Sequence, residues 1–152
     1  MKLLNSDLKR SSYTVLAEEI TTSNSEITYL TCKKFLIIYR ISRGCITNTE
    51  NQMELPIESL SWLRESIVNG FWRLPSAGGL PKDKHTVSAT FDGEEILLGR
   101  SMNAGDYGRT GFKIVNISRK SHIMSSRPQE FQITDERVEK VLFPLFDKLG
   151  VS

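Results

Sequence analysis

The sequence predicts an α+β fold in which two ββββα repeats, each an antiparallel sheet packed against a helix, form a single domain over residues 1–152. Strand-like alternation followed by an amphipathic helix occurs twice along the chain. The two stretches also share residues, because Ile41-Ser42-Arg43 recurs 76 positions later (117 − 41) as Ile117-Ser118-Arg119. Leu55 matches Phe131 at the same distance. With 152 residues, 39% of them hydrophobic, the chain can bury a full core without disulfides or metals.

The first repeat is expected at residues 11–71. Tyr13, Val15 and Ala17 alternate with their neighbours in the way typical of a half-buried strand, and a polar turn follows at residues 21–26. Further strands are predicted at residues 27–31, 35–43 and 52–55. Pro56 ends the last strand because it has no N–H to donate, and apolar residues at helical spacing over 57–68 then predict a helix that stops at Gly70.

The second repeat is expected at residues 85–150, after a linker at 72–84 that is rich in Pro and Gly. Strands are predicted at residues 86–91, 95–102, 112–119 and 128–133, the first two joined by an Asp92-Gly93 turn. Thr134 is the predicted N-cap of a closing helix, and Pro144 is predicted to kink that helix or to end its regular part early. Because repeated units bury their faces against one another, we expect the two halves to share one core.

A ββββα unit that occurs twice, with a Gly-x-Phe-x-Ile strand and a strand-to-helix junction, resembles the Pur (purine-rich element binding) repeat. It also resembles the related Whirly and positive-transcription-cofactor folds. The closest stretch is 93–149, where residues 107–114 look like the Pur Gly-Arg-Phe-Leu-Lys-Ile strand with two extra residues. In the first half, residues 55–63 are similar to the junction of the cofactor fold. The resemblance implies noncatalytic binding of single-stranded nucleic acid.

Basic and aromatic residues interleave on the predicted strands, as they do in proteins that hold a single strand by its phosphates and stack its bases. On strand 35–43 the alternation places Arg40 on the face of Leu36 and Ile38, and Tyr39 and Arg43 on the other face. The alternative interpretation is that these are solvated charges at strand ends, with Phe35 and Phe112 in the core. The candidate nucleic-acid-binding residues are Lys33, Lys34, Tyr39, Arg40, Arg43, Arg100, Tyr107, Arg109, Lys113, Arg119 and Lys120.

Composition limits the function classes. The net charge of +2 is too small to attract phosphate by bulk charge, so a nucleic-acid site needs basic residues gathered on one face. Cys32 and Cys45 are expected to be free thiols in an intracellular protein, nuclear or cytoplasmic. The longest apolar run, residues 35–39, is too short to span a bilayer, so no membrane partner is expected.

Local motifs for catalysis are missing from the sequence. His85 and His122 stand alone, without the spacing that places metal ligands or a catalytic triad together, so we expect no enzyme, metal or cofactor. The glycine-containing loop 103–111 is predicted to join two strands rather than to bind phosphate, because no helix follows it. The expected partner is single-stranded DNA or RNA. The alternative is a protein-protein interaction module on the same fold, with a second copy or another protein as partner.

Overall fold

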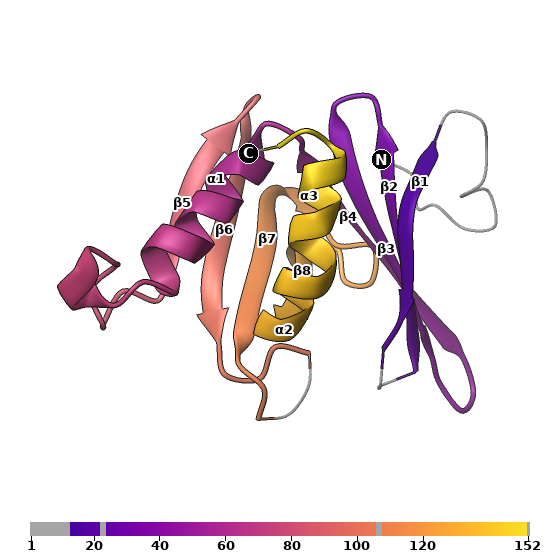
Figure 1. Cartoon of the computed structure of the whole chain (residues 1–152). Coiled ribbons are helices and arrows are strands. Elements are labelled where there is room, and N and C mark those ends of the chain that lie inside the picture. The colour runs from indigo at the N-terminus through magenta and orange to yellow at the C-terminus, as the bar shows by residue number, and fades with distance from the viewer. Residues whose placement is uncertain (1–12, 22–23, 106–107, 152) are drawn as a thin grey trace.

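Two four-stranded antiparallel sheets form the frame of the molecule in a computed structural model that describes residues 13–21, 24–105 and 108–151. Sheet A has the order β1-β2-β3-β4, and sheet B has the order β5-β6-β7-β8 (Figure 1). Sheet A contains β1 (Thr14–Ile20), β2 (Ser25–Cys32), β3 (Phe35–Arg43) and β4 (Asn48–Pro56). Sheet B contains β5 (Thr86–Phe91), β6 (Glu94–Ser101), β7 (Gly111–Lys120) and β8 (Pro128–Thr134). The α+β class and the ββββα order of both halves are confirmed.

A helix follows each sheet, and each contains a wide π-helical turn. Helix 1 comprises α1 (Ser59–Glu65) and η2 (Ser66–Phe71), and the linker after it contains the short 3-10 turn η3 (Pro75–Ala77). Helix 2 comprises α2 (Asp135–Arg137), η4 (Val138–Leu142) and α3 (Phe143–Lys148). Thr134 caps helix 2 as predicted, because its hydroxyl accepts a hydrogen bond from the Arg137 N–H at 3.3 Å.

The end of helix 1 differs from the prediction, whereas helix 2 loses regular α-helical geometry next to Pro144, as predicted. Helix 1 runs past Gly70, and the Trp72 N–H donates to the Ile67 carbonyl five residues back. A side chain at Gly70 would crowd Leu80, since an added Cβ would lie 3.2 Å from the Leu80 Cδ1. Helix 2 continues beyond Pro144 to Lys148, and the wide turn η4 comes directly before the proline-containing segment. Wide turns of this kind relieve the loss of the regular hydrogen-bond ladder next to proline.

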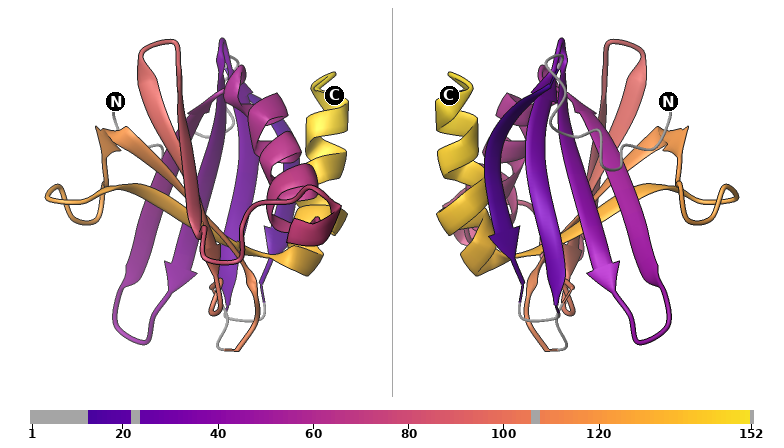
Figure 2. Two further views of the ribbon diagram at one scale, coloured as in Figure 1. Left: turned by 90° about the vertical axis from the view of Figure 1, so that its left-hand side faces the viewer. Right: turned by 90° about the vertical axis from the view of Figure 1, so that its right-hand side faces the viewer.

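Each helix contacts the sheet of the other half. Trp62 of helix 1 packs on Phe91 of β5 with ring centroids 5.5 Å apart, and Phe71 packs on Phe112 of β7 at 5.6 Å. Helix 2 reaches β1, where the Lys148 Nζ donates to a backbone carbonyl at 3.1 Å. The helices lie side by side against the inner faces of the sheets, and no described helix covers either outer face (Figures 1 and 2). The buried cluster between them therefore contains residues of both halves.

The sheets also meet along the edge of β4. The Glu54 N–H donates to the Gln129 side chain of β8 at 3.0 Å, and the Glu54 carbonyl accepts from the Asn116 side chain of β7 at 2.8 Å. Asn51 completes the contact by donating from its side chain to the Glu130 carbonyl at 3.3 Å. Side-chain amides of one half thus satisfy backbone groups that the edge strand of the other would leave unpaired.

Candidate nucleic-acid interface

Arg100 lies in a hydrogen-bond network that joins sheet B to helix 2. Its guanidinium contacts both carboxylate oxygens of Asp135, at 2.5 and 2.9 Å, and its central carbon lies 4.6 Å from the Phe112 ring centroid. Trp72 and Thr110 also donate to Asp135. Partial burial alone would raise the pKa of Asp135, but these hydrogen bonds outweigh it and hold the pKa below its usual value. Arg100 therefore stabilises the fold and is not free to bind phosphate.

Arg119 lies between the two sheets. Its Nε donates to Glu94 at 2.5 Å, its Nη1 lies 3.3 Å from the fully buried Glu54 carboxylate, and its central carbon lies 4.6 Å from the Phe35 ring centroid. Burial works against ionisation of Glu94, yet hydrogen bonds from Arg119 and Asn116 lower its pKa. Because its donors are engaged by two carboxylates, the guanidinium is held as a fixed plane.

Two candidates on β3 face opposite sides of sheet A, as their alternation predicted. Tyr39 is on the outer face and only 1% exposed, so a base has no access to its ring. Burial raises the pKa of Tyr39, and the nearby Glu50 carboxylate raises it further. Arg40 is half-buried on the inner face, where burial and the charge of Arg137 lower its pKa. Tyr107 lies outside the described residues.

Three other candidates form ion pairs at the surface. Arg43 pairs with Glu26, Arg109 lies 3.6 Å from Glu136, and Lys113 lies 3.8 Å from Glu130. The side chains in these pairs are 38% to 63% exposed, so water screens each pair and either partner can exchange for another ion. They are available to phosphate but lie apart, Arg43 on β3, Lys113 on β7 and Arg109 in the loop before β7.

The remaining candidates gather where the two halves meet. Lys33 and Lys34 form the turn from β2 to β3, immediately before Phe35, and Lys120 follows Arg119 at the end of β7. The contact of Arg119 with the Phe35 ring brings these two segments together, and we call Lys33, Lys34, Phe35, Arg119 and Lys120 the basic junction. The three lysines are exposed, and within the described residues no carboxylate forms an ion pair with them.

Sequence reasoning missed a second group of cations, in the segment interpreted as a linker. Arg73, Lys82, Lys84 and His85 line a hollow of about 290 Å³ beside Arg100. The Lys82–His85 run is the sequence feature that could have identified this group. The proline and glycine residues around it predicted a linker instead. Within this group Arg73 donates to Asn69, and Lys82 and Lys84 are exposed.

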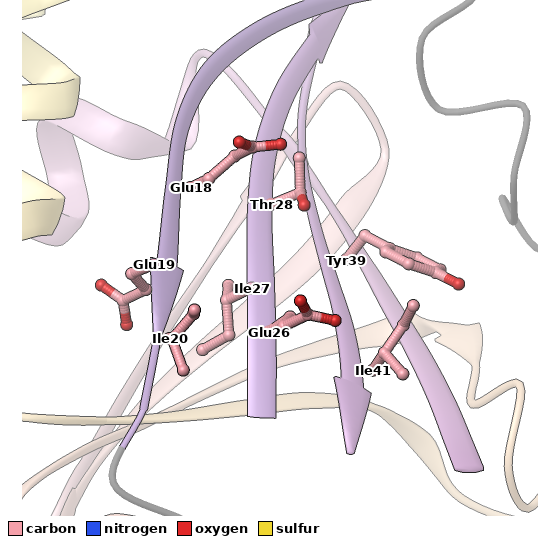
Figure 3. A pocket seen from close by; sticks show the side chains of 8 residues that line it. All are labelled: Glu18, Glu19, Ile20, Glu26, Ile27, Thr28, Tyr39 and Ile41. Carbon is pink, nitrogen blue, oxygen red and sulfur yellow. The ribbon is translucent and has the colours of Figure 1, made fainter. Parts of the chain in front are cut away.

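The outer face of sheet A carries a hollow of a different chemistry. Figure 3 shows side chains of β1, β2 and β3 around it, with carboxylates beside isoleucines. The hollow measures about 520 Å³, and Ile20 at its edge is 77% exposed. Carboxylates repel phosphate, so this face does not suit a nucleic-acid backbone. The lining residues are Glu18, Glu19, Ile20, Glu26, Ile27, Thr28, Tyr39 and Ile41.

Comparison of the chain with protein-family models, with curated proteins and with solved structures found no match. Among the described residues, no helix has the length and apolar character needed to cross a membrane. The resemblance to the Pur repeat therefore rests on the sequence motifs.

Proposed function

We propose that this protein binds single-stranded nucleic acid, without catalysis, at the basic junction. The observation that supports the proposal is the meeting of two basic segments from different halves, made by Arg119 above the Phe35 ring. The segments lie far apart in sequence, at residues 33–34 and 119–120. Convergence of cations next to an aromatic ring is the arrangement that single-strand binding uses.

Different residues of the basic junction are expected to contact the phosphates and the bases. Lys33, Lys34 and Lys120 contribute exposed positive charges to the sugar-phosphate backbone. Half-buried Phe35 and the fixed guanidinium of Arg119 offer flat surfaces on which an unpaired base stacks. Because stacking needs a free base face, a single strand should bind more tightly than a duplex of the same sequence.

Fluorescence anisotropy with labelled oligonucleotides across a salt series tests this proposal. The Lys33→Ala/Lys34→Ala variant should bind more weakly, with a salt slope reduced by about 0.7 for each phosphate that it no longer neutralises. Lys82→Ala/Lys140→Ala removes the same charge from exposed lysines elsewhere and is the matched control. Equal reductions in affinity in the two variants, or equal affinity for single strand and duplex, would refute a site at the junction.

Protein binding on the same fold is a second candidate function, favoured by the hollow on sheet A. Exposed Ile20 beside Glu18 and Glu26 suits a segment that carries both apolar and basic side chains. A synthetic peptide of alternating lysine and leucine is a suitable probe. The Ile20→Ser variant should bind it more weakly, whereas Lys33→Ala/Lys34→Ala should bind it as the unmodified protein does. No difference between the two variants would count against this candidate.

A further inference from the structure

We propose that this chain forms a symmetric homodimer in which β5 pairs, antiparallel, with β5 of a second copy. The strand lies at the edge of sheet B and is hydrogen-bonded only to β6. Such an edge presents free N–H and C=O groups that template pairing with another strand. Natural proteins protect sheet edges that do not pair with another strand, so an unprotected edge indicates a strand-pairing partner.

The other sheet edges are all contacted by side chains. At β1, the Lys148 Nζ donates to the Leu16 carbonyl at 3.1 Å, beside a bulge in the strand. At β4, both backbone groups of Glu54 are bonded, as described above. At β8, the Asn51 side chain donates to the Glu130 carbonyl. Among the edge strands that the structure describes, β5 alone has no such contact, and its sequence TVSATF contains neither charge nor proline.

The outward backbone groups of β5 belong to alternate residues. The Arg100 N–H donates to the His85 carbonyl at 2.9 Å, which fixes the residues of β5 that bond to β6. In an antiparallel pair every second residue makes these bonds. Thr86, Ser88 and Thr90 therefore direct their N–H and C=O groups away from β6, and their side chains are exposed on the outer face of sheet B.

These residues define a self-complementary register. An antiparallel partner centred on Ser88 places Ser88 opposite Ser88 of the second copy and Thr86 opposite its Thr90. All the outward residues are then paired, and the ladder contains about six hydrogen bonds. Small hydroxyl side chains face one another across the join, a pairing that antiparallel sheets favour. The contact is isologous and closes as a dimer, so it does not propagate.

Charges beyond the ends of β5 agree with the same register. Lys84 precedes the strand and Asp92 follows it, and the register centred on Ser88 brings Lys84 of each copy opposite Asp92 of the other. Both residues are exposed, and neither forms an ion pair within the described residues. Beside the edge, half-buried Trp62 and Phe91 contact each other and offer apolar surface that a second copy would cover.

Sedimentation equilibrium of the full chain over a concentration series tests the dimer. Ser88→Pro removes an outward N–H without touching a bond to β6, so the variant should keep its fold, checked by circular dichroism. Its dimer should be roughly tenfold weaker or more, because two hydrogen bonds at the centre are removed. Ser88→Ala keeps the N–H and should dimerise like the unmodified chain. A chain that stays monomeric over the whole series would overturn the proposal.

Cysteine cross-linking tests the register without relying on proline. In a chain with Cys32 and Cys45 replaced by serine, Ser88→Cys should form a disulfide dimer rapidly, since paired Cα atoms about 5.5 Å apart are within disulfide reach. Thr90→Cys is the matched control, because its two copies would lie about 14 Å apart. Cross-linking of Thr90→Cys as fast as that of Ser88→Cys would exclude this register.

Discussion

Arg43 and Arg119 end the same Ile-Ser-Arg tripeptide at the third strand of each half, yet they have different surroundings. Arg43 pairs with Glu26 at the surface, and both side chains are nearly half exposed. Arg119 lies between the sheets against Glu94, Glu54 and Phe35, and its side chain is 23% exposed. A repeated sequence therefore places an arginine at an equivalent position of each strand without giving the two arginines the same role.

The two arginines differ because the contact between the sheets is asymmetric. The edge of β4 contacts β7 and β8, which places the end of β7 against the first half. Among the residues that the structure describes, the end of β3 makes no side-chain hydrogen bond to sheet B, because the hairpin from β3 to β4 extends beyond the core (Figure 1). In a duplicated fold, the contact between the copies decides which of two matching residues is structural.

The largest loss of unfolding free energy is expected from substitutions in the core that the two halves share. Leu63 of helix 1 and Leu142 of helix 2 are both fully buried in the shared cluster. Either substitution by alanine should lower the free energy of unfolding by roughly 2 to 5 kcal/mol. If the halves share one core, calorimetry should show each variant shifting a single transition. Two separate transitions in the intact chain would show two independent units.

Arg119→Ala should have the next largest effect. The substitution leaves the Glu54 carboxylate buried without its cationic partner, so we expect a loss of about 2 kcal/mol in unfolding free energy by chemical denaturation. Glu54→Gln with Arg119→Ala should recover part of that loss, because the fully buried carboxylate is then neutral and only Glu94, 14% exposed, lacks its cationic partner. A variant as stable as the unmodified chain would mean that the pair is solvated.

A smaller effect is expected from Asp135, through pH. Its pKa is lowered on folding, so its hydrogen bonds stabilise the protein at neutral pH, and this contribution is lost as pH falls from about 4 through the lower folded pKa. Asp135→Asn should cost about 1 kcal/mol at pH 7. The difference in melting temperature between the two proteins should shrink below about pH 4. A difference that does not change with pH would exclude the carboxylate as its source.

The smallest effect is expected for Arg43→Ala. Exposed ion pairs contribute little, so the unfolding free energy should fall by less than about 0.5 kcal/mol. Comparing its unfolding free energy with that of Arg119→Ala tests whether the two matching arginines differ in their contribution to stability. Equal losses of stability for the two would remove the distinction between a surface pair and a buried one.

Much of the fold could be predicted from local patterns. The order of strands and helices, the Asp92-Gly93 turn and the Thr134 cap depend on residues close together in sequence. The start of β4 at Asn48 lies before the predicted start at residue 52, because residues 48–51 are polar and lack the apolar alternation that predicts a strand. Residues 48 and 49 are exposed, so the strand needs no apolar alternation at its start.

The candidate site was harder to predict. Contacts between segments far apart in sequence decide which of its residues are engaged within the fold and which are accessible. Nothing near Arg100 or Arg119 in sequence reveals that Asp135 and Glu54 engage them. The burial of Tyr39 likewise depends on its place in the folded sheet. The lysines of the basic junction are identifiable as cations in the sequence, but only the folded chain shows that none of them forms an ion pair with a described carboxylate.

The packing of helix 1 on sheet B has a consequence for synthesis on the ribosome. Helix 1 is complete at Phe71, but its aromatic partners Phe91 and Phe112 are made later. At about 5 to 20 residues per second, roughly 2 to 8 seconds separate Phe71 from Phe112. During that interval the apolar side of helix 1 has no sheet B to cover it. The nascent chain must therefore keep this surface from aggregating until its second half emerges.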